Sequence, residues 1–343
     1  MRVFVSLVAV VALFLIGLFG AGALGLRGLF GVIIPYAAAA IFLIGFFAKV
    51  LGWARTPVPF AIPTTCGQQK SLPWIKQSKI ENPSTTLGVV IRMALEVLAF
   101  RSLFRNTKTE LVGDRITYSS NKWLWAAGIG FHYSMLVILL RHLRFFTEPV
   151  PGFVVAIQRM DGFMIIGMPE VYVTTGLFIA ALGFLLVRRL WSAPIRYISL
   201  AADYFALFLL LGIGLSGAWM RHIAKIDVPA VKGFVMGLLH LSPQASAALG
   251  PVFFAHLFLV STLLMYIPFS KLMHMGGVFL SPTRNLTANT REVRHVNPWN
   301  KPLPLHTYEE YEDEFRERMI EAGIPVDKQG PSKAAPQHAH KEA

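Results

Sequence analysis

The stretch WLWAAGIGFHYSMLVILLRHLRFF, residues 123–146, decides the fold of this protein. It contains no acidic residue, and its two arginines stand near its end. An apolar run of this length is long enough to cross about 30 Å of hydrocarbon as one helix. It also contains His132 and His142, and an ionisable side chain inside a membrane helix is costly enough to indicate a functional site. The stretch therefore predicts a membrane helix that carries function.

Five further apolar runs have the same character. They cover residues 3–24, 29–53, 171–191, 198–219 and 251–269. Of the 343 residues, 54% are hydrophobic and only 15% are charged, whereas about a quarter of the residues of a soluble domain are charged. The first run is longer than the apolar part of a signal peptide, so we expect a retained helix. The predicted fold class is all-α, a polytopic membrane helix bundle with six transmembrane helices.

The Lys and Arg residues are distributed unequally between the loops. One side of the predicted bundle has about 24 of them and the other side about 7, and cytoplasmic loops are the ones enriched in positive charge. We therefore expect a multi-pass protein of the cell inner (cytoplasmic) membrane with both termini in the cytoplasm. The formal net charge of +13 follows this topology, without a basic patch interleaved with aromatic residues. Composition thus predicts no nucleic-acid partner.

The chain divides by composition into four parts. We expect two N-terminal transmembrane helices in residues 1–53, and a cytoplasmic loop in 54–122 with an amphipathic interfacial helix at 87–104. A core of four helices follows in residues 123–280, and a cytoplasmic tail with a charged helix at 308–321 completes the chain at 281–343. The single Cys66 excludes an internal disulfide, and a lone cysteine in a basic loop is more often incidental than redox-active.

Four of the ten histidines lie in two of the predicted spans or at their ends: His132 and His142 in the third span, His256 and His274 in the sixth. A hydrogen bond to a backbone carbonyl explains any one of them equally well. Two on each of two helices favour haem, because neutral imidazole binds iron through one nitrogen while an acceptor holds the other N–H. Two imidazoles fill both axial positions, so such a haem only transfers electrons. We therefore predict two haem b groups with these four histidines as iron ligands.

The direction of the spans suggests how the four histidines pair. The third and sixth spans run in opposite directions, so we expect His142 to meet His256 and His132 to meet His274. At 1.5 Å per residue, the two histidines are about 15 Å apart on one span and about 27 Å apart on the other. The remaining difference of about 12 Å must be absorbed by tilt and by the reach of the side chains. Spacing alone leaves this pairing open.

Two arginines flank His142. Arg141 and Arg144 could pair with haem propionates, and snorkelling arginines at a helix end are an equally good explanation. Gly128 and Gly130 stand before His132, where they could let a flat macrocycle approach the helix or could serve ordinary helix packing. The sequence does not choose between these alternatives.

The histidine spacing resembles that of the cytochrome b (gamma) subunit family of respiratory nitrate reductase. Two histidines ten residues apart on one helix are followed by two that are 18 apart on a later helix. The resemblance implies that all four are axial ligands of two haems, with the crosswise pairing described above. Two flanking stretches, residues 60–69 (FAIPTTCGQQ) and 281–287 with 295–300 (SPTRNLT and HVNPWN), look like the DsrM family, the membrane cytochrome b of the Dsr complex in sulfate reducers and sulfur oxidisers.

The DsrM-like flanks imply a quinone-linked subunit of a multi-subunit oxidoreductase. The chain is then expected to exchange electrons between menaquinone or another quinone and a cytoplasmic iron–sulfur subunit, in dissimilatory sulfur metabolism. A multihaem cytochrome c and further membrane subunits are expected as additional partners, and the terminal catalytic site lies on another subunit. The alternatives are a cytochrome b of a nitrate reductase, hydrogenase or formate dehydrogenase, and a transporter whose second span breaks at Pro35.

The quinone site is expected near the outer haem, between the third, fifth and sixth spans. The candidate side chains are His222, Lys225 and Asp227 after the fifth span and Arg144 after the third. A histidine with a pKa near neutrality suits the task of accepting a quinol proton. We therefore predict His222 as the catalytic proton acceptor, although a histidine in an exposed loop is more often a bystander.

Overall fold

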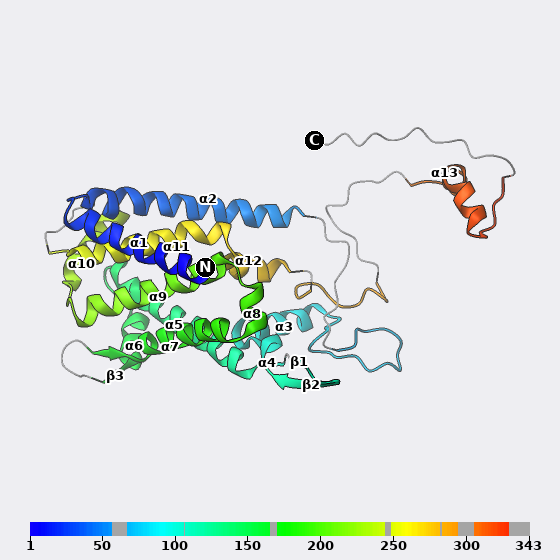
Figure 1. Cartoon of the computed structure of the whole chain (residues 1–343), viewed down its shortest axis with the longest axis horizontal. Coiled ribbons are helices and arrows are strands. Elements are labelled where there is room, and N and C mark those ends of the chain that lie inside the picture. Colours follow the sequence, from blue (N-terminus) through cyan, green and yellow to red (C-terminus); the bar gives the residue numbers. More distant parts are fainter. Residues whose placement is uncertain are drawn as a thin grey trace. The chain divides into compact units, whose positions relative to one another are not determined.

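The computed structural model describes residues 1–56, 67–105, 107–164, 170–243, 248–281, 283–293 and 305–328. Its contacts divide the chain into two compact units, Met1–His295 and Val296–Ala343. The first unit is a bundle of long helices (Figure 1). Cys66 and most of the DsrM-like flanks lie outside the described residues.

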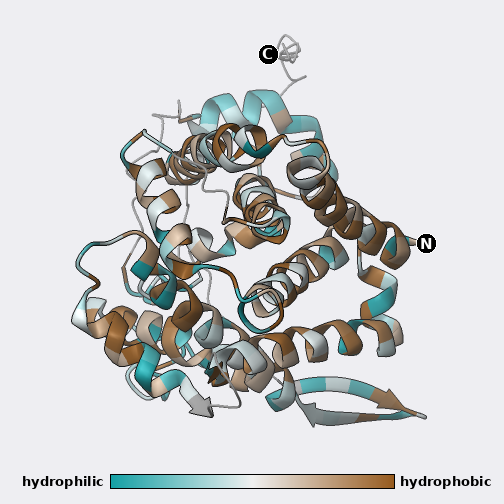
Figure 2. Cartoon of the chain, turned by 90° about the vertical axis from the view of Figure 1, so that its left-hand side faces the viewer, coloured by the Kyte–Doolittle hydropathy of each residue, from teal (hydrophilic) through white to brown (hydrophobic). Residues whose placement is uncertain are grey.

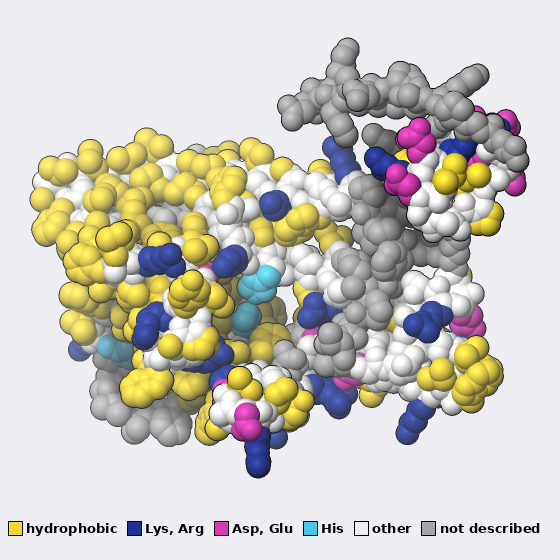
Figure 3. Space-filling view, turned by 45° about the vertical axis from the view of Figure 1, so that its right-hand side comes forward, with side chains coloured by type: hydrophobic (Ala, Val, Ile, Leu, Met, Phe, Trp, Pro, Cys, Tyr) yellow, Lys and Arg dark blue, Asp and Glu magenta, His cyan; other side chains and the backbone are white. Residues whose placement is uncertain are grey.

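Six helical segments are long and apolar enough to cross a membrane, as the sequence predicted. Figure 2 looks along this bundle and shows helices that are largely hydrophobic. Figure 3 shows hydrophobic side chains over much of its visible side, as expected for a surface that faces lipid. The protein is therefore a multi-pass membrane protein. The segments are α1 (Arg2–Gly22), a π-helical turn (Leu29–Ile33) with α2 (Ile34–Ala54), α5 (Lys122–His142) with a 3-10 turn (Leu143–Phe145), α7 (Val173–Trp191), α9 (Ala201–His222), and α11 (Pro251–Tyr266) with a 3-10 turn (Ile267–Phe269).

The helices pack around α1 and α11. Helix α1 contacts both α9 and α11, α2 lies against α11, and α7 lies between α5 and α9. At the crossing of α1 and α11, a Cβ atom on Gly17 would come within 2.9 Å of the Ala255 Cα, so only glycine permits this approach. Within the described residues, α5 is not packed closely on α11. Helix α5, which carries His132 and His142, is therefore separated from α11, which carries His256, and α7 and α9 complete the core between them.

Shorter elements cover the two ends of the bundle. We call the end with α3, α4 and α8 the basic end, and the end with α6 and α10 the far end (Figure 1). These elements are α3 (Thr86–Ala99), α4 (Arg101–Arg105), α6 (Gly152–Asp161), α8 (Ala193–Ile198), α10 (Val228–Leu239), a 3-10 turn (Lys271–Met273), α12 (His274–Gly277) and a 3-10 turn (Val278–Leu280).

The segment predicted as an interfacial helix at 87–104 is helical, but the prediction of one continuous helix is wrong. The structure has two helices, α3 and α4, because Phe100 between them adopts a left-handed conformation with φ of 48°. The carbonyl groups at the end of α3 find donors on α5: Trp125 Nε1 donates to Ala99 O at 2.8 Å, and Tyr133 Oη donates to Leu98 O at 2.7 Å. Side chains of α5 thus replace helix hydrogen bonds that the break removes.

Two short antiparallel hairpins were not predicted. In one, β1 (Thr107–Val112) pairs with β2 (Arg115–Ser120) so that Val112 lies opposite Arg115 across a two-residue turn. Gly113 in that turn has φ of +65°, and a Gly-Asp pair at this place favours a tight hairpin. In the other, β3 (Gly162–Met164) pairs with β4 (Val171–Tyr172).

The second unit contains α13 (Tyr308–Glu321), the charged helix that the sequence predicted. Its start is a capping box, in which Thr307 and Glu310 each bond the backbone N–H of the other. Burial raises the pKa of the Glu312 carboxyl, but the N–H groups of Lys328 and Asp327 and the Arg316 guanidinium lower it further than burial raises it. Residues 327–328 are therefore folded back onto this helix.

Candidate functional site

The two histidines of α5 lie opposite one histidine of α11 and one of α12. The ring centres of His132 and His274 are 6.1 Å apart, with the rings nearly perpendicular at 83°. This pair lies toward the basic end. His142 lies within electrostatic range of His256 toward the far end, and we treat these two as the second pair. The crosswise juxtaposition is the one expected from the antiparallel spans.

Three of the four imidazoles are held in the same way. In each, Nδ1 bonds a backbone carbonyl three or four residues earlier in the chain. A carbonyl oxygen only accepts, so Nδ1 carries the proton and Nε2 keeps a free lone pair. The Nδ1–oxygen distances are 2.7 Å for His132 to Gly128, 2.7 Å for His142 to Ile138 and 2.9 Å for His274 to Lys271.

His256 reaches the same protonation state through a side chain of α9. The Ser216 Oγ lies 2.8 Å from His256 Nδ1 and 3.1 Å from the carbonyl oxygen of Ile213. The hydroxyl has one hydrogen, which it donates to the carbonyl, so it accepts the Nδ1–H of His256. A Cβ on Gly217 would lie 3.5 Å from His256 Cε1, so α9 is close along this ring. Sequence reasoning missed Ser216, whose only signal was a small polar residue in an apolar helix.

For His132 and His274, the Nε2 lone pairs and the ring spacing fit a haem between the two rings. A bond from iron to an imidazole nitrogen is about 2 Å, and the ring centre lies about 1 Å further, so two axial imidazoles have centres about 6 Å apart. The described residues contain no group of three or more His, Cys, Asp or Glu side chains arranged around a metal ion, and a haem iron needs only two protein ligands. The donor set therefore suits haem better than a bare metal ion.

The segment that carries His274 differs from the expectation. The 18-residue separation from His256 was predicted along one continuous helix, which is wrong. Helix α11 ends at Tyr266, Pro268 follows in a 3-10 turn, and Ser270 is extended with ψ of 173° before the chain turns again at Lys271. Proline has no N–H and clashes with the preceding turn, so the helix ends there. The separation of about 27 Å, which assumed 18 residues of continuous helix, therefore does not apply to this segment.

Aromatic rings surround His132. Phe100, at the break between α3 and α4, contacts it edge-on with ring centres 4.9 Å apart, and Phe131 does so at 4.7 Å. At the far end, Phe145 lies 5.7 Å from His142. A Cβ on Gly128 would meet Leu103 and Phe100 at 3.7 and 3.8 Å, which are ordinary contact distances, so packing against these side chains does not require a glycine.

The two arginines beside His142 already have protein partners. Arg141 Nε lies 3.0 Å from Asp161 Oδ2, and its guanidinium carbon lies 3.8 Å from the centre of the Tyr172 ring. Arg144 donates to Gln158 Oε1 at 2.8 Å. A role at haem propionates remains a prediction for both. Asp161, which is buried and also bonds Thr174, was not predicted as the partner of Arg141.

The predicted quinone residues lie at the far end. His222 is the last residue of α9 and is half-buried. It stands about 9 Å beyond Ser216 along the helix axis. Asp227 accepts the Ala230 N–H at 3.1 Å and thereby caps α10. The proton-accepting role of His222 stays a prediction.

Comparisons with known proteins identify a matching family and two relatives of this chain. The family model of the nitrate reductase gamma subunit matches residues 87–295, which include all four histidines. An Hdr-like menaquinol oxidoreductase cytochrome b-like subunit of Archaeoglobus fulgidus is 46% identical over 279 residues, covering 79% of this chain and 83% of the relative. A protein of the same description from Archaeoglobus profundus is 42% identical over 283 residues, with the same coverage of both chains.

Proposed function

This chain belongs to the nitrate reductase gamma subunit family, and we propose that it is a membrane cytochrome b with two haems, which passes electrons from a quinol to a partner subunit at the basic end. The observation that carries the proposal is the arrangement of the histidines. Four imidazoles on separated helices form two pairs, and each has its Nδ1 occupied and its Nε2 available. A structural histidine needs its hydrogen bond but does not need a second imidazole opposite it.

The protein residues hold and orient the groups that carry electrons. His132 and His274 ligate the haem at the basic end, and His142 and His256 ligate the haem at the far end. When bound, each haem would supply a one-electron carrier, and two histidine ligands would leave no site for oxygen. The two histidine pairs lie at different depths in the bilayer. Two haems held there would together carry electrons across a thickness of membrane that one haem does not cover. Apolar side chains of α7, α9 and α11 exclude water around them.

The basic end faces the cytoplasm in this proposal. The Lys and Arg residues concentrate there, and positive charge marks the cytoplasmic side of membrane proteins. Both termini then lie in the cytoplasm, and the far end faces outward from the inner membrane. Electrons released at the far end would move inward across the bilayer.

The quinol is proposed to be oxidised beside the far pair. The relatives are described as menaquinol oxidoreductase subunits, which favours menaquinol as the substrate. Each quinol gives two electrons, which leave one at a time, and two protons, which leave on the outer side. His222, half-buried at the far end of α9, is the proposed first proton acceptor, since neutral imidazole accepts a proton near neutral pH.

The partner is proposed to dock on the cytoplasmic loop. A cavity of about 830 Å³ in residues 70–105 is lined by five cationic side chains and one carboxylate, Glu81. Phe100, next to the cavity residue Arg101, contacts His132. An acidic surface of an iron–sulfur subunit that binds here would approach the haem at the basic end. The cations are Lys70, Lys76, Lys79, Arg101 and Arg105.

A role in dissimilatory sulfur metabolism is the finer part of the proposal. It is supported by the DsrM-like stretches at 60–69, 281–287 and 295–300. The expected partners are then an iron–sulfur subunit, a multihaem cytochrome c and further membrane subunits. A nitrate reductase, hydrogenase or formate dehydrogenase partner is the alternative. Purification of the native complex and identification of its subunits decides between them.

A quinol reduction assay tests the function directly. Purified protein should be red, and a menaquinol analogue should reduce both haems in stopped-flow absorbance. In His222→Ala, with both haems verified, we expect slower reduction. Unchanged rates and unchanged inhibitor affinity would exclude His222 alone. A colourless preparation would contradict the whole proposal and favour a transporter.

A further inference from the structure

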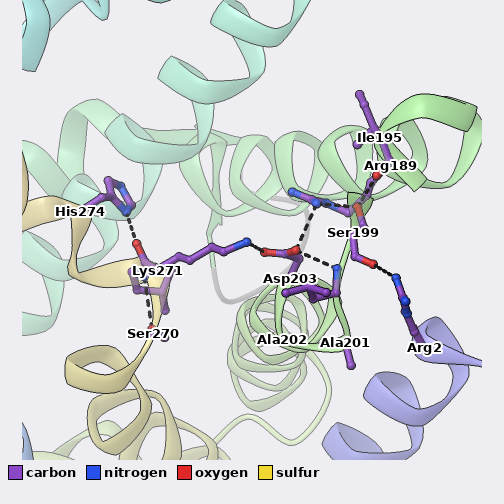
Figure 4. A network of polar contacts seen from close by, with 12 residues as sticks. Arg2, Arg189, Ile195, Ser199, Ala201, Ala202, Asp203, Ser270, Lys271 and His274 are labelled. Atoms are coloured by element: carbon purple, nitrogen blue, oxygen red, sulfur yellow. Dashed lines mark hydrogen bonds and ion pairs between the residues drawn. The ribbon is translucent and has the colours of Figure 1, made fainter. Parts of the chain in front are cut away.

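A buried carboxylate lies at the basic end of α9. The side chain of Asp203 is only 9% exposed, and it accepts the Leu200 N–H at 2.9 Å as a helix cap. It also accepts a hydrogen bond from Lys271 Nζ at 2.7 Å, and Arg189 Nη1 lies 3.8 Å from it (Figure 4). Burying a carboxylate beside the hydrocarbon is costly unless it is paired, so two cations accompany it. The cap alone needs neither of them.

Lys271 connects this carboxylate to a predicted haem ligand. Its ammonium bonds Asp203, and its carbonyl oxygen accepts the Nδ1–H of His274 at 2.9 Å (Figure 4). The connection matters because no regular helix holds this segment: Ser270 is extended, and Lys271 begins a three-residue 3-10 turn. Tyr266 Oη, which donates to Ala202 O at 3.2 Å, attaches the segment to the start of α9 from its other side.

We propose that Asp203 is a positioning residue for the ligand His274. Through the Lys271 ammonium it fixes the turn whose carbonyl orients the His274 imidazole toward His132. The proposal rests on the proposed haem function and goes beyond it, because neither Asp203 nor Lys271 touches the iron-binding nitrogen. Hydrogen bonds to the far side of a ligating imidazole set its orientation and basicity, and their loss changes metal binding measurably.

Asp203 and Lys271 could affect the haem at the basic end through their charges or by positioning His274. These two effects predict different results in variants of the two residues. Asp203→Asn removes a negative charge and Lys271→Met a positive one, so through charge alone the midpoint potential of the nearby haem would rise in the first and fall in the second. Both variants also remove the ion pair between Asp203 and Lys271, which we call the tether. Loss of position should therefore change the low-spin electron paramagnetic resonance signal in both, because its largest g value depends on the angle between the imidazole planes. The double variant cancels the charge change and still lacks the tether.

The Lys271 side chain is 76% exposed, so Lys271→Met should fold even if Asp203→Asn does not. We expect an altered g value of the basic-end haem in Lys271→Met and in the double variant, with two haems still bound. Lys271→Arg, which keeps the ion pair, should restore it. As a matched control, Asp161→Asn removes the buried carboxylate at the far end and should leave the basic-end signal unchanged.

The possible outcomes distinguish failure of the positioning role of Asp203 from failure of the proposed haem function. A wild-type signal in Lys271→Met, or in the double variant, would overturn the positioning role while leaving the haem function intact. A protein that binds no haem in any form, wild type included, would instead contradict the proposed function itself.

Discussion

The two histidine pairs are held by different means. At the far end, His256 lies in the regular helix α11, and the Ser216 hydroxyl of a neighbouring helix accepts its N–H. At the basic end, His274 lies after the end of α11, and the acceptor is the backbone carbonyl of Lys271. The far site should therefore respond to replacement of one hydroxyl. The basic-end site has no such side chain and should respond to changes in the turn and in the rings around it.

Removal of a ligand is expected to have the largest effect and tests whether the pairs are independent. His256→Ala should lose the far haem alone, and His132→Ala the basic-end haem alone, so that haem per protein falls from two to one in each. His240→Ala is the control, because its Nδ1 bonds the Met236 carbonyl at 2.8 Å in the same manner. Pyridine haemochrome quantification measures the ratio. Two haems remaining in His256→Ala would refute the pairing.

Replacement of Ser216 is expected to separate the two sites with a smaller effect. Ser216→Ala removes the acceptor of the His256 N–H, and loss of such a partner weakens ligand binding about 10-fold to 100-fold. Dilution or detergent challenge should release the far haem first and leave the basic-end haem in place. Ser134→Ala is matched, since Ser134 is equally buried and donates to the Phe131 carbonyl. Equal haem retention in the two serine variants would contradict the account.

One aromatic ring contacts a histidine of each pair, and we expect replacement of these rings to have smaller effects than the changes above. Phe100→Leu removes an edge contact with His132, and Phe145→Leu removes one with His142. Such contacts contribute about 0.5–1.5 kcal/mol each. We expect the first change to shift only the spectrum of the basic-end haem and the second only that of the far haem. Both haems shifting equally in either variant would show that the sites are not separate.

Deletion of the second unit should change neither site. Residues 283–293 hold the segment that follows α2, since Gln69 Nε2 donates to Thr290 Oγ1 at 2.7 Å and the Ala288 N–H donates to the Pro83 carbonyl at 2.7 Å. A chain that ends at residue 295 keeps these contacts, so both haems should remain at full ratio. Loss of the basic-end haem from that chain would mean that the second unit supports the site. If the unit docks a partner, pull-down from the native membrane will show its release.

The transmembrane helices could be predicted from the sequence, because they are determined by the hydrocarbon core of the membrane. Six apolar runs became six spans because a membrane helix must satisfy its backbone within itself, so length and hydropathy suffice. The break at Phe100 was beyond reach, since it depends on donors from Trp125 and Tyr133 that lie far along the chain. The hairpin at 107–120 was not predicted although Gly113-Asp114 is a turn signal, because its strands are short and largely polar.

The four histidines could be chosen from the sequence as candidate ligands, and their ligand role stays a prediction. The opposite directions of the spans predicted that His132 and His274 meet, which the structure shows, whereas the residues that hold the imidazoles could not be predicted. Ser216 and Lys271 could not be found, because their roles depend on the rotation of α9 and on the bend after Tyr266. The pairing of Arg141 with Asp161 likewise depends on α6, an element that was not predicted.

One measurement tests the central claim most directly: a redox titration of the purified wild-type protein, followed by absorbance and electron paramagnetic resonance, with haem and protein quantified in the same sample. The account predicts two b-type haems per chain, both low-spin with two imidazole ligands, that titrate in two one-electron steps. A single haem, a high-spin haem with an open axial position, or no haem would contradict it.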